Sequence, residues 1–121
     1  MANILLAEDD QSMCSFISLA LEKAGHHVTA THNGLDALAE IENGETVYDL
    51  LLSDIVMPGM DGVELSNKAT KLHPKLKVSF ITGFAAVAMG RDDLDQEKAQ
   101  ILAKPFHLND LVKQVETMLA A

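Results

Sequence analysis

The sequence is poor in cysteine, aromatic residues and basic residues. Its single cysteine, Cys14, cannot form an intrachain disulfide, so a disulfide-stapled fold is excluded and a reducing compartment, the cytoplasm, is expected. Aromatic residues make up 4% of the chain and tryptophan is absent, which argues against a platform for stacking nucleic-acid bases. No apolar run approaches the roughly 20 residues needed to cross a bilayer, and the amino terminus lacks the basic region of a signal peptide.

Basic residues are also outnumbered by acidic ones. Nine Lys and Arg residues stand against 18 Asp and Glu residues, which gives a net charge of −9. This balance argues against binding to nucleic acid or to an anionic membrane surface, because both need clustered basic side chains. It favours a metal cation or a partner with a basic surface.

The chain has 121 residues and a hydrophobic fraction of 48%, which is the size and composition of one globular domain. No internal repeat, low-complexity stretch or linker rich in Ser, Pro and Gly divides it. We therefore expect one domain over residues 1–121. Nothing follows the last predicted helix, so no separate output domain is expected.

Short apolar runs alternate five times with longer helical patterns. The predicted strands are Asn3–Ala7, His27–Ala30, Asp49–Ser53, Lys77–Ile81 and Ile101–Ala103. Helical spacing of apolar residues is found over Met13–Ala24, Leu65–Leu72 and Leu108–Leu119, and more weakly over Ala85–Gln100. Leu35, Leu38 and Ala39 indicate a further helix that closes near Asn43-Gly44. Asn33-Gly34 indicates a turn and Met57–Gly62 a loop. Strands buried on both faces that alternate with helices predict an α/β fold, with a parallel sheet covered by helices on each side.

Four of the five predicted strands end at polar residues of definite type. These residues are Glu8-Asp9-Asp10, Asp54, Thr82 and Lys104. In an open parallel α/β sheet, sites lie beyond the carboxyl ends of the strands. Residues far apart in the sequence are therefore expected to converge at this edge.

The residues at these strand ends are of the types needed to bind a metal ion and to accept a phosphoryl group. Clustered carboxylates repel one another and raise one another's pKa values, and Mg²⁺ relieves this while keeping several waters. A carboxylate can attack a phosphoryl group to form an acyl phosphate. Lys104 would balance charge on the phosphoryl oxygens and the Thr82 hydroxyl would donate to one of them.

Each residue also has a simpler interpretation. The acidic run could be a solvated loop in which Asp10 or Ser12 caps the following helix. Asp54 could be a turn residue, and Lys104 could belong to an ordinary loop. The joint placement at four strand ends favours a common site.

Four segments resemble the receiver domain of two-component response regulators, and the resemblance covers essentially the whole chain. They are ILLAEDD at Ile4–Asp10, LLLSDIVMPGMDG at Leu50–Gly62, FITG at Phe80–Gly83 and LAKPF at Leu102–Phe106. The resemblance implies a flavodoxin-like fold with strand order 2-1-3-4-5. It also implies that Asp54 is the phospho-acceptor, and that Glu8 and Asp9 form an acidic pair for Mg²⁺ with Asp9 favoured as the direct ligand.

The resemblance assigns roles to four further positions. The backbone carbonyl of Val56 is the third direct protein ligand of Mg²⁺, beside Asp9 and Asp54, and Glu8 acts through a water molecule. Thr82 and Lys104 contact the phosphoryl group, and the bond from Lys104 to Pro105 is cis. Asp10 lies outside the site.

The chain departs from the family pattern at positions that bear on signalling and on phosphate lifetime. Ile101 replaces an aromatic residue that swings inward in the family, so it cannot act as that rotamer switch; Phe84 or Phe106 could substitute. Neither Val56 nor Phe84 can hydrogen-bond a water for attack on the acyl phosphate, so slow self-dephosphorylation is expected.

The resemblance implies a stand-alone phospho-acceptor switch and not an enzyme with a separate substrate. Its phosphoryl donor would be a histidine kinase or a histidine phosphotransfer protein. Similarity to single-domain regulators of the bacterial cell cycle implies that the unphosphorylated form primes the ClpXP protease or its substrates. Because no output domain is expected, output would come from surface recognition by a face built from residues 85–121. The tail Leu119-Ala120-Ala121 is either a degradation signal or a frayed helix end.

The sequence offers three alternative functions. One is a phosphorelay intermediate that passes phosphate from Asp54 to another histidine protein. The sequence does not distinguish this function from that of an adaptor. A haloacid-dehalogenase-type phosphatase usually has a second Asp two residues after the nucleophile, where this chain has Val56. A flavodoxin-like cofactor binder needs a first loop rich in Ser, Thr and Gly, and here that loop is acidic.

Overall fold

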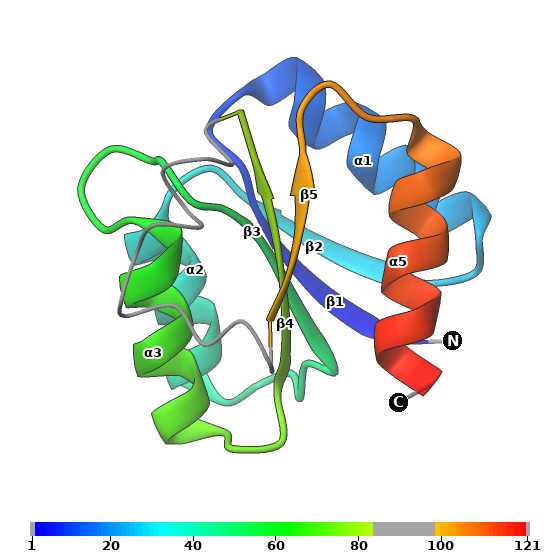
Figure 1. Ribbon diagram of the computed structural model, residues 1–121. Helices are drawn as coiled ribbons and strands as arrows, with labels where there is room; N and C mark the ends of the chain where they lie inside the picture. The colour runs from blue at the N-terminus through cyan, green and yellow to red at the C-terminus, as the bar shows by residue number, and fades with distance from the viewer. Residues whose placement is uncertain (1, 84–98, 121) are drawn as a thin grey trace.

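The computed structural model describes residues 2–83 and 99–120, which form a five-stranded sheet with helices on both faces (Figure 1). The strands are β1 (Asn3–Ala7), β2 (His27–Thr31), β3 (Leu50–Asp54), β4 (Lys77–Thr82) and β5 (Ala99–Ala103). Every neighbouring pair is parallel, and the order is β2-β1-β3-β4-β5. The predicted fold class and strand order are confirmed.

The described helices form one layer on each face of the sheet. They are α1 (Gln11–Lys23), α2 (Gly34–Asn43), α3 (Gly62–Leu72) and α5 (Leu108–Ala120). Figure 1 shows α1 and α5 side by side on one face, and α2 and α3 on the other. Since β1 and β3 lie inside the sheet, their side chains are buried on both faces, which explains their continuous apolar sequences.

Two hydrophobic cores follow from the alternation of side chains along the strands. Ile4 and Leu6 of β1 pack with Ile17 of α1 and Leu111 of α5. Leu5 and Ala7 face the other way and join the residues of α2 and α3. Each fully buried Leu or Ile contributes about 1.5–3 kcal/mol, so the two cores hold β1 and the acidic run that follows it in place.

Capping side chains start three of the helices. Asp10 accepts a hydrogen bond from the Met13 amide at 3.0 Å, and Asn33 accepts one from the Asp36 amide at 2.8 Å. Asp61 caps α3 in the same way. Each cap satisfies an amide that the first helical turn leaves without a partner.

Two predicted boundaries around these helices were wrong. Asn33-Gly34 does not form a separate turn, because Asn33 caps α2 and Gly34 is its first residue. Gly62 likewise belongs to α3 and not to the preceding loop. The third strand runs from Leu50 to Asp54, one residue later than predicted.

The weak helical pattern over Ala85–Gln100 falls mostly on residues 84–98, outside the described residues. Its last two residues are not helical: Ala99 and Gln100 belong to β5 and pair with Val78 and Ser79 of β4. Pairing with a distant strand therefore overrides the local pattern.

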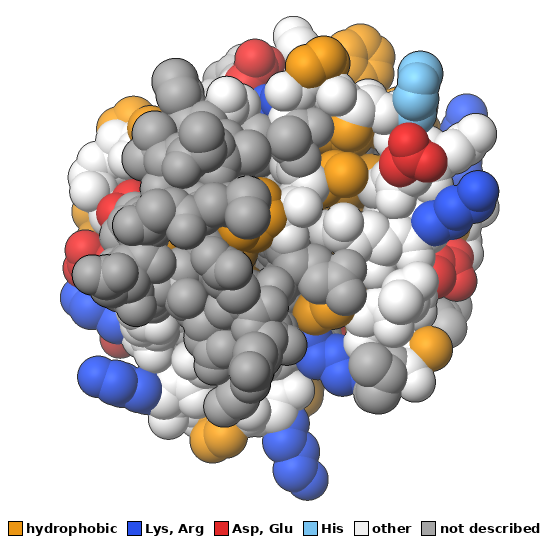
Figure 2. All heavy atoms as spheres, in the orientation of Figure 1, with side chains coloured by type: hydrophobic (Ala, Val, Ile, Leu, Met, Phe, Trp, Pro, Cys, Tyr) orange, Lys and Arg blue, Asp and Glu red, His pale blue; other side chains and the backbone are white. Residues whose placement is uncertain are grey.

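In the described ranges, no helix combines the length and apolar character of a membrane span. On the face shown in Figure 2, hydrophobic side chains reach the surface in small separate groups among charged and polar ones. Lys and Arg side chains lie mainly along the lower and right-hand parts of that view.

Candidate functional site

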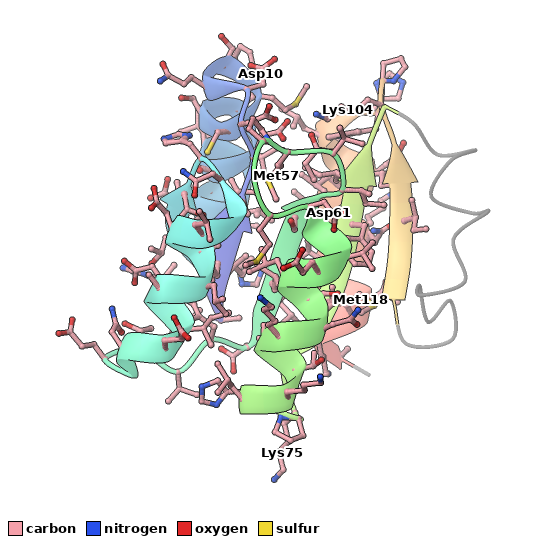
Figure 3. The ribbon with its side chains drawn as sticks, turned by 90° about the vertical axis from the view of Figure 1, so that its left-hand side faces the viewer. Asp10, Met57, Asp61, Lys75, Lys104 and Met118 are labelled. Atoms are coloured by element: carbon pink, nitrogen blue, oxygen red, sulfur yellow. The ribbon has the colours of Figure 1, made fainter. Side chains whose placement is uncertain are left out.

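The carboxyl ends of β1 and β3 bring two acids together. The β1–β3 register ends at Ala7 opposite Ser53, so Glu8 and Asp54 follow on neighbouring strands. Lys104 follows β5 and reaches back over this edge. In Figure 3, Lys104 and Asp10 lie at the same end of the molecule, and Lys75 lies at the opposite end.

The described side chains converge as the sequence predicted. Carboxylate oxygens of Glu8, Asp9 and Asp54 all lie within 4.8 Å of one another. The Nζ atom of Lys104 donates to Oε1 of Glu8 at 2.5 Å and to Oδ2 of Asp54 at 3.0 Å. One ammonium group therefore bridges two of the three clustered acids.

Burial makes this cluster electrostatically unusual. Glu8 is fully buried and Asp54 is 6% exposed, whereas Asp9 is exposed. Burial and the neighbouring Asp54 raise the pKa of Glu8 from 4.5 to about 8, and Lys104 lowers it by a smaller amount. Burial alone lowers the pKa of the Lys104 ammonium, but its contacts with Glu8 and Asp54 outweigh burial and leave that pKa raised.

The local backbone around Asp54 depends on a close approach by α3. The Gly62 amide donates to the Ile55 carbonyl at 2.8 Å. A Cβ atom at Gly62 would overlap the carbonyl oxygen of Asp54. Only glycine lets α3 start this close to the end of β3.

The peptide bond from Lys104 to Pro105 is cis, as the resemblance implied. Thr82 ends β4 and pairs with Ala103, which puts its backbone at the same edge of the sheet. Its side chain is not among those that the structure describes. Val56 lies two residues after Asp54, and its side chain is 50% exposed.

Asp10 has the role that the simpler interpretation gave it, because its side chain caps α1. Glu8 and Asp9, in contrast, belong to the acid cluster. The acidic run therefore divides between capping and the candidate site.

The acid cluster fits a divalent cation. Oε2 of Glu8 is buried and has no hydrogen-bond partner among the described residues, which is costly for a carboxylate unless a cation or a proton binds there. Hard oxygen ligands from a few carboxylates are the donors that Mg²⁺ prefers. The residues present therefore match the expected ion.

The residues considered for the rotamer switch pack against different hydrophobic cores, one on each face of the sheet. Ile101 packs against the core under α2 and α3, and Phe106 packs against the core under α1 and α5. Phe106 therefore lies on the face opposite to Ile101. Phe84, the other candidate, lies outside the described residues.

Sequence reasoning missed two residues at this site. Gly62 was assigned to the loop and not to the support of Asp54. His32 follows β2, the one strand whose end was not considered, and its Nδ1 lies 3.3 Å from the Glu8 carbonyl oxygen. A polar residue at that fifth strand end was the available signal.

The family model for the response regulator receiver domain matches residues 4–116. The chain belongs to the response regulator receiver family. This receiver domain is 54% identical over 121 residues to the response regulator receiver protein CpdR of Brucella abortus, covering 100% of this chain and 99% of that one.

Solved structures agree with this assignment. A response regulator receiver protein from Sinorhizobium medicae superposes with a TM-score of 0.89 at 28% identity, covering 99% of this receiver domain and 95% of that chain. The response regulator TrrA from Thermotoga maritima, solved in complex with Mg²⁺ and BeF, gives a TM-score of 0.84 at 27% identity, covering 98% and 99% of the two chains.

Proposed function

We propose that this receiver domain is a stand-alone response regulator that accepts a phosphoryl group on Asp54 and controls a partner protein through its phosphorylation state. One observation carries the proposal: the Asp54 carboxylate has the Lys104 ammonium 3.0 Å away and two further acids beside it. Two neighbouring acids would only destabilise the ionised form of a buried carboxylate that had no cation beside it. A nucleophile that works beside a bound cation needs them.

The proposed donor is a phosphohistidine on a histidine kinase or a histidine phosphotransfer protein. An Asp54 carboxylate oxygen attacks the phosphorus, the new O–P bond forms as the P–N bond breaks, and the released imidazole nitrogen takes a proton from water. Lys104 balances negative charge on the phosphoryl oxygens, and the Thr82 hydroxyl is proposed to donate to one of them.

When bound, Mg²⁺ supplies positive charge that offsets the acids and the phosphoryl oxygens. Glu8, Asp9, Asp54 and the backbone carbonyl of Val56 are the groups proposed to hold it. The buried Oε2 of Glu8, for which the described part of the chain offers no hydrogen-bond partner, supports this assignment. These residues are proposed to hold the ion and to orient the phosphoryl group. The domain is proposed to catalyse only its own phosphotransfer and a slow hydrolysis of its acyl phosphate.

We propose further that the unphosphorylated form primes the ClpXP protease, or substrates of it, in the bacterial cytoplasm. The 54% identity with CpdR over nearly the whole of both chains supports this assignment. Phosphorylation would act by shifting a two-state equilibrium of the binding face.

The acceptor role is tested with purified protein, an acyl-phosphate donor and Mg²⁺, with intact mass as the readout. Wild type is expected to gain one phosphoryl group and Asp54→Ala none. Asp10→Asn is the matched control, since it changes a neighbouring acid outside the cluster and Asn caps a helix as well as Asp. An adduct that persists in Asp54→Ala would overturn the proposal.

The adaptor role is tested with purified ClpX and ClpP. Unphosphorylated wild type and Asp54→Ala are expected to stimulate degradation of a ClpXP substrate, and phosphorylated wild type is not. The alternative, a phosphorelay intermediate, predicts instead that phosphate on Asp54 moves to a second histidine protein while degradation is unaffected.

A further inference from the structure

The end of β2 is tied to the end of β1 by three hydrogen bonds. The Thr31 hydroxyl donates to the Leu6 carbonyl at 2.8 Å, in a buried position. The Glu8 amide donates to the Thr31 carbonyl at 3.1 Å. The third bond joins Nδ1 of His32 to the Glu8 carbonyl oxygen at 3.3 Å.

The hydrogen bond from His32 serves a carbonyl oxygen that lies beyond the strand pairing of the sheet. The registers of β1 with β2 and with β3 both end at Ala7, so Glu8 lies one residue beyond the paired strands. A carbonyl oxygen only accepts, so Nδ1 of His32 must carry the proton and donate. The imidazole thereby takes the place of a strand amide.

That carbonyl belongs to the peptide unit that joins Glu8 to Asp9. The unit is planar, so a hydrogen bond to its oxygen orients its amide as well and sets the direction in which the chain enters Asp9. Two of the three acids of the cluster, Glu8 and Asp9, lie on either side of this unit. Their relative orientation therefore depends on His32.

His32 is itself held in a defined place. Thr31 before it is buried and bonded to β1, and Asn33 after it caps α2 through the Asp36 amide. The His32 side chain is exposed, so a contribution to core packing is small. What the ring contributes is the directed hydrogen bond.

We infer that His32 is a positioning residue for cation binding, which acts by orienting the peptide between Glu8 and Asp9. This inference rests on the proposed function, because it concerns the same acid cluster. Groups that orient metal ligands from outside the coordination shell change metal affinity by roughly 10- to 100-fold when they are removed.

The test is a Mg²⁺ titration of the metal-free protein, followed through the NMR amide signals of the site. His32→Ala is expected to weaken Mg²⁺ binding about tenfold. His32→Asn is expected to bind like wild type, because its side-chain amide can donate from nearly the same place. His73→Ala is the control, because it removes an exposed histidine at the carboxyl end of α3, away from the acid cluster.

A second readout does not depend on metal. Long-range ¹⁵N NMR of neutral His32 is expected to show the proton on Nδ1, because the hydrogen bond decides the tautomer. Equal Mg²⁺ affinity of wild type and His32→Ala, or a proton on Nε2, overturns the inference alone. Absence of Mg²⁺ binding in wild type overturns it together with the proposed site.

Discussion

The ammonium group of Lys104 lies 3.0 Å from Oδ2 of Asp54, and both groups are largely shielded from water. We predict that Lys104→Met slows phosphorylation of Asp54 by an acyl-phosphate donor roughly a hundredfold, since a buried donor to developing charge has about that effect. Rates are read by intact mass against time. Lys75→Met, at the opposite end of the molecule, is expected to react at the wild-type rate. Equal rates for the two variants would contradict the role of Lys104.

The raised pKa of Glu8 predicts how stability depends on pH in the absence of divalent ions. Its pKa is 4.5 when unfolded and about 8 when folded, so the folded protein holds the proton more tightly. The contribution of Glu8 to the free energy of unfolding therefore falls as pH rises from 4.5 to 8. Urea unfolding at several pH values checks this slope.

Glu8→Gln is the control for that experiment, because it is nearly the same size and cannot ionise. The difference in slope between wild type and Glu8→Gln isolates the carboxyl. Since Mg²⁺ competes with the proton, its affinity for wild type is expected to rise with pH over the same window. A wild-type slope no steeper than that of Glu8→Gln contradicts the raised pKa.

Substitutions of Asp9 and Asp10 are expected to have different effects, one on metal binding and the other on helix capping. Asp9→Asn is predicted to weaken Mg²⁺ binding with little change in the free energy of unfolding, because Asp9 is exposed. Asp10→Ala is predicted to lower that free energy by about 1 kcal/mol through loss of the α1 cap, with unchanged Mg²⁺ affinity. Mg²⁺ titration and urea unfolding of both variants decide the matter, and exchanged effects would refute the division.

The close approach of α3 predicts the effect of a single methyl group. Gly62→Ala is expected to destabilise the fold by about 1–3 kcal/mol through overpacking and to slow phosphorylation by displacing Asp54. Gly83→Ala is the matched control, because an added Cβ there meets no atom of the described residues within 4 Å. Comparable stability of the two variants would show that the backbone adjusts freely.

The lifetime of the phosphorylated form is predicted from the residues that follow Asp54 and Thr82. Val56→Asn combined with Phe84→Ala is expected to shorten the half-life of phospho-Asp54, because Asn can hold a water for attack on the acyl phosphate. Val47→Asn, another exposed valine, is the control. A half-life that is unchanged in the double variant contradicts the proposal of slow hydrolysis.

The features that could be predicted from the sequence are those that a local pattern encodes. Apolar runs that stop abruptly marked the ends of β1 and β3, and parallel pairing then placed Glu8 beside Asp54. Asn33-Gly34 was misassigned because Asn favours both turns and helix caps. The start of β5 at Ala99 depends on pairing with Val78, which no local pattern records.

The support of the site was less visible than its acids. Gly62 is required by the approach of α3 to the Asp54 backbone, a contact that exists only after the helix has packed. His32 contributes through one hydrogen bond to a main-chain oxygen, and its residue type alone does not indicate this. Chemistry-bearing side chains are thus easier to predict than the residues that orient them.

The contact between Glu8 and Lys104 joins positions 96 residues apart in the chain. The acid cluster and Lys104 therefore come together only after β5 has docked on β4, so the proposed phosphorylation site is completed by the folded sheet and not by any local segment. A cation that binds only the native state also raises its free energy of unfolding by RT ln(1 + [L]/Kd). Mg²⁺ bound at the acid cluster is therefore expected to raise the free energy of unfolding of the whole domain.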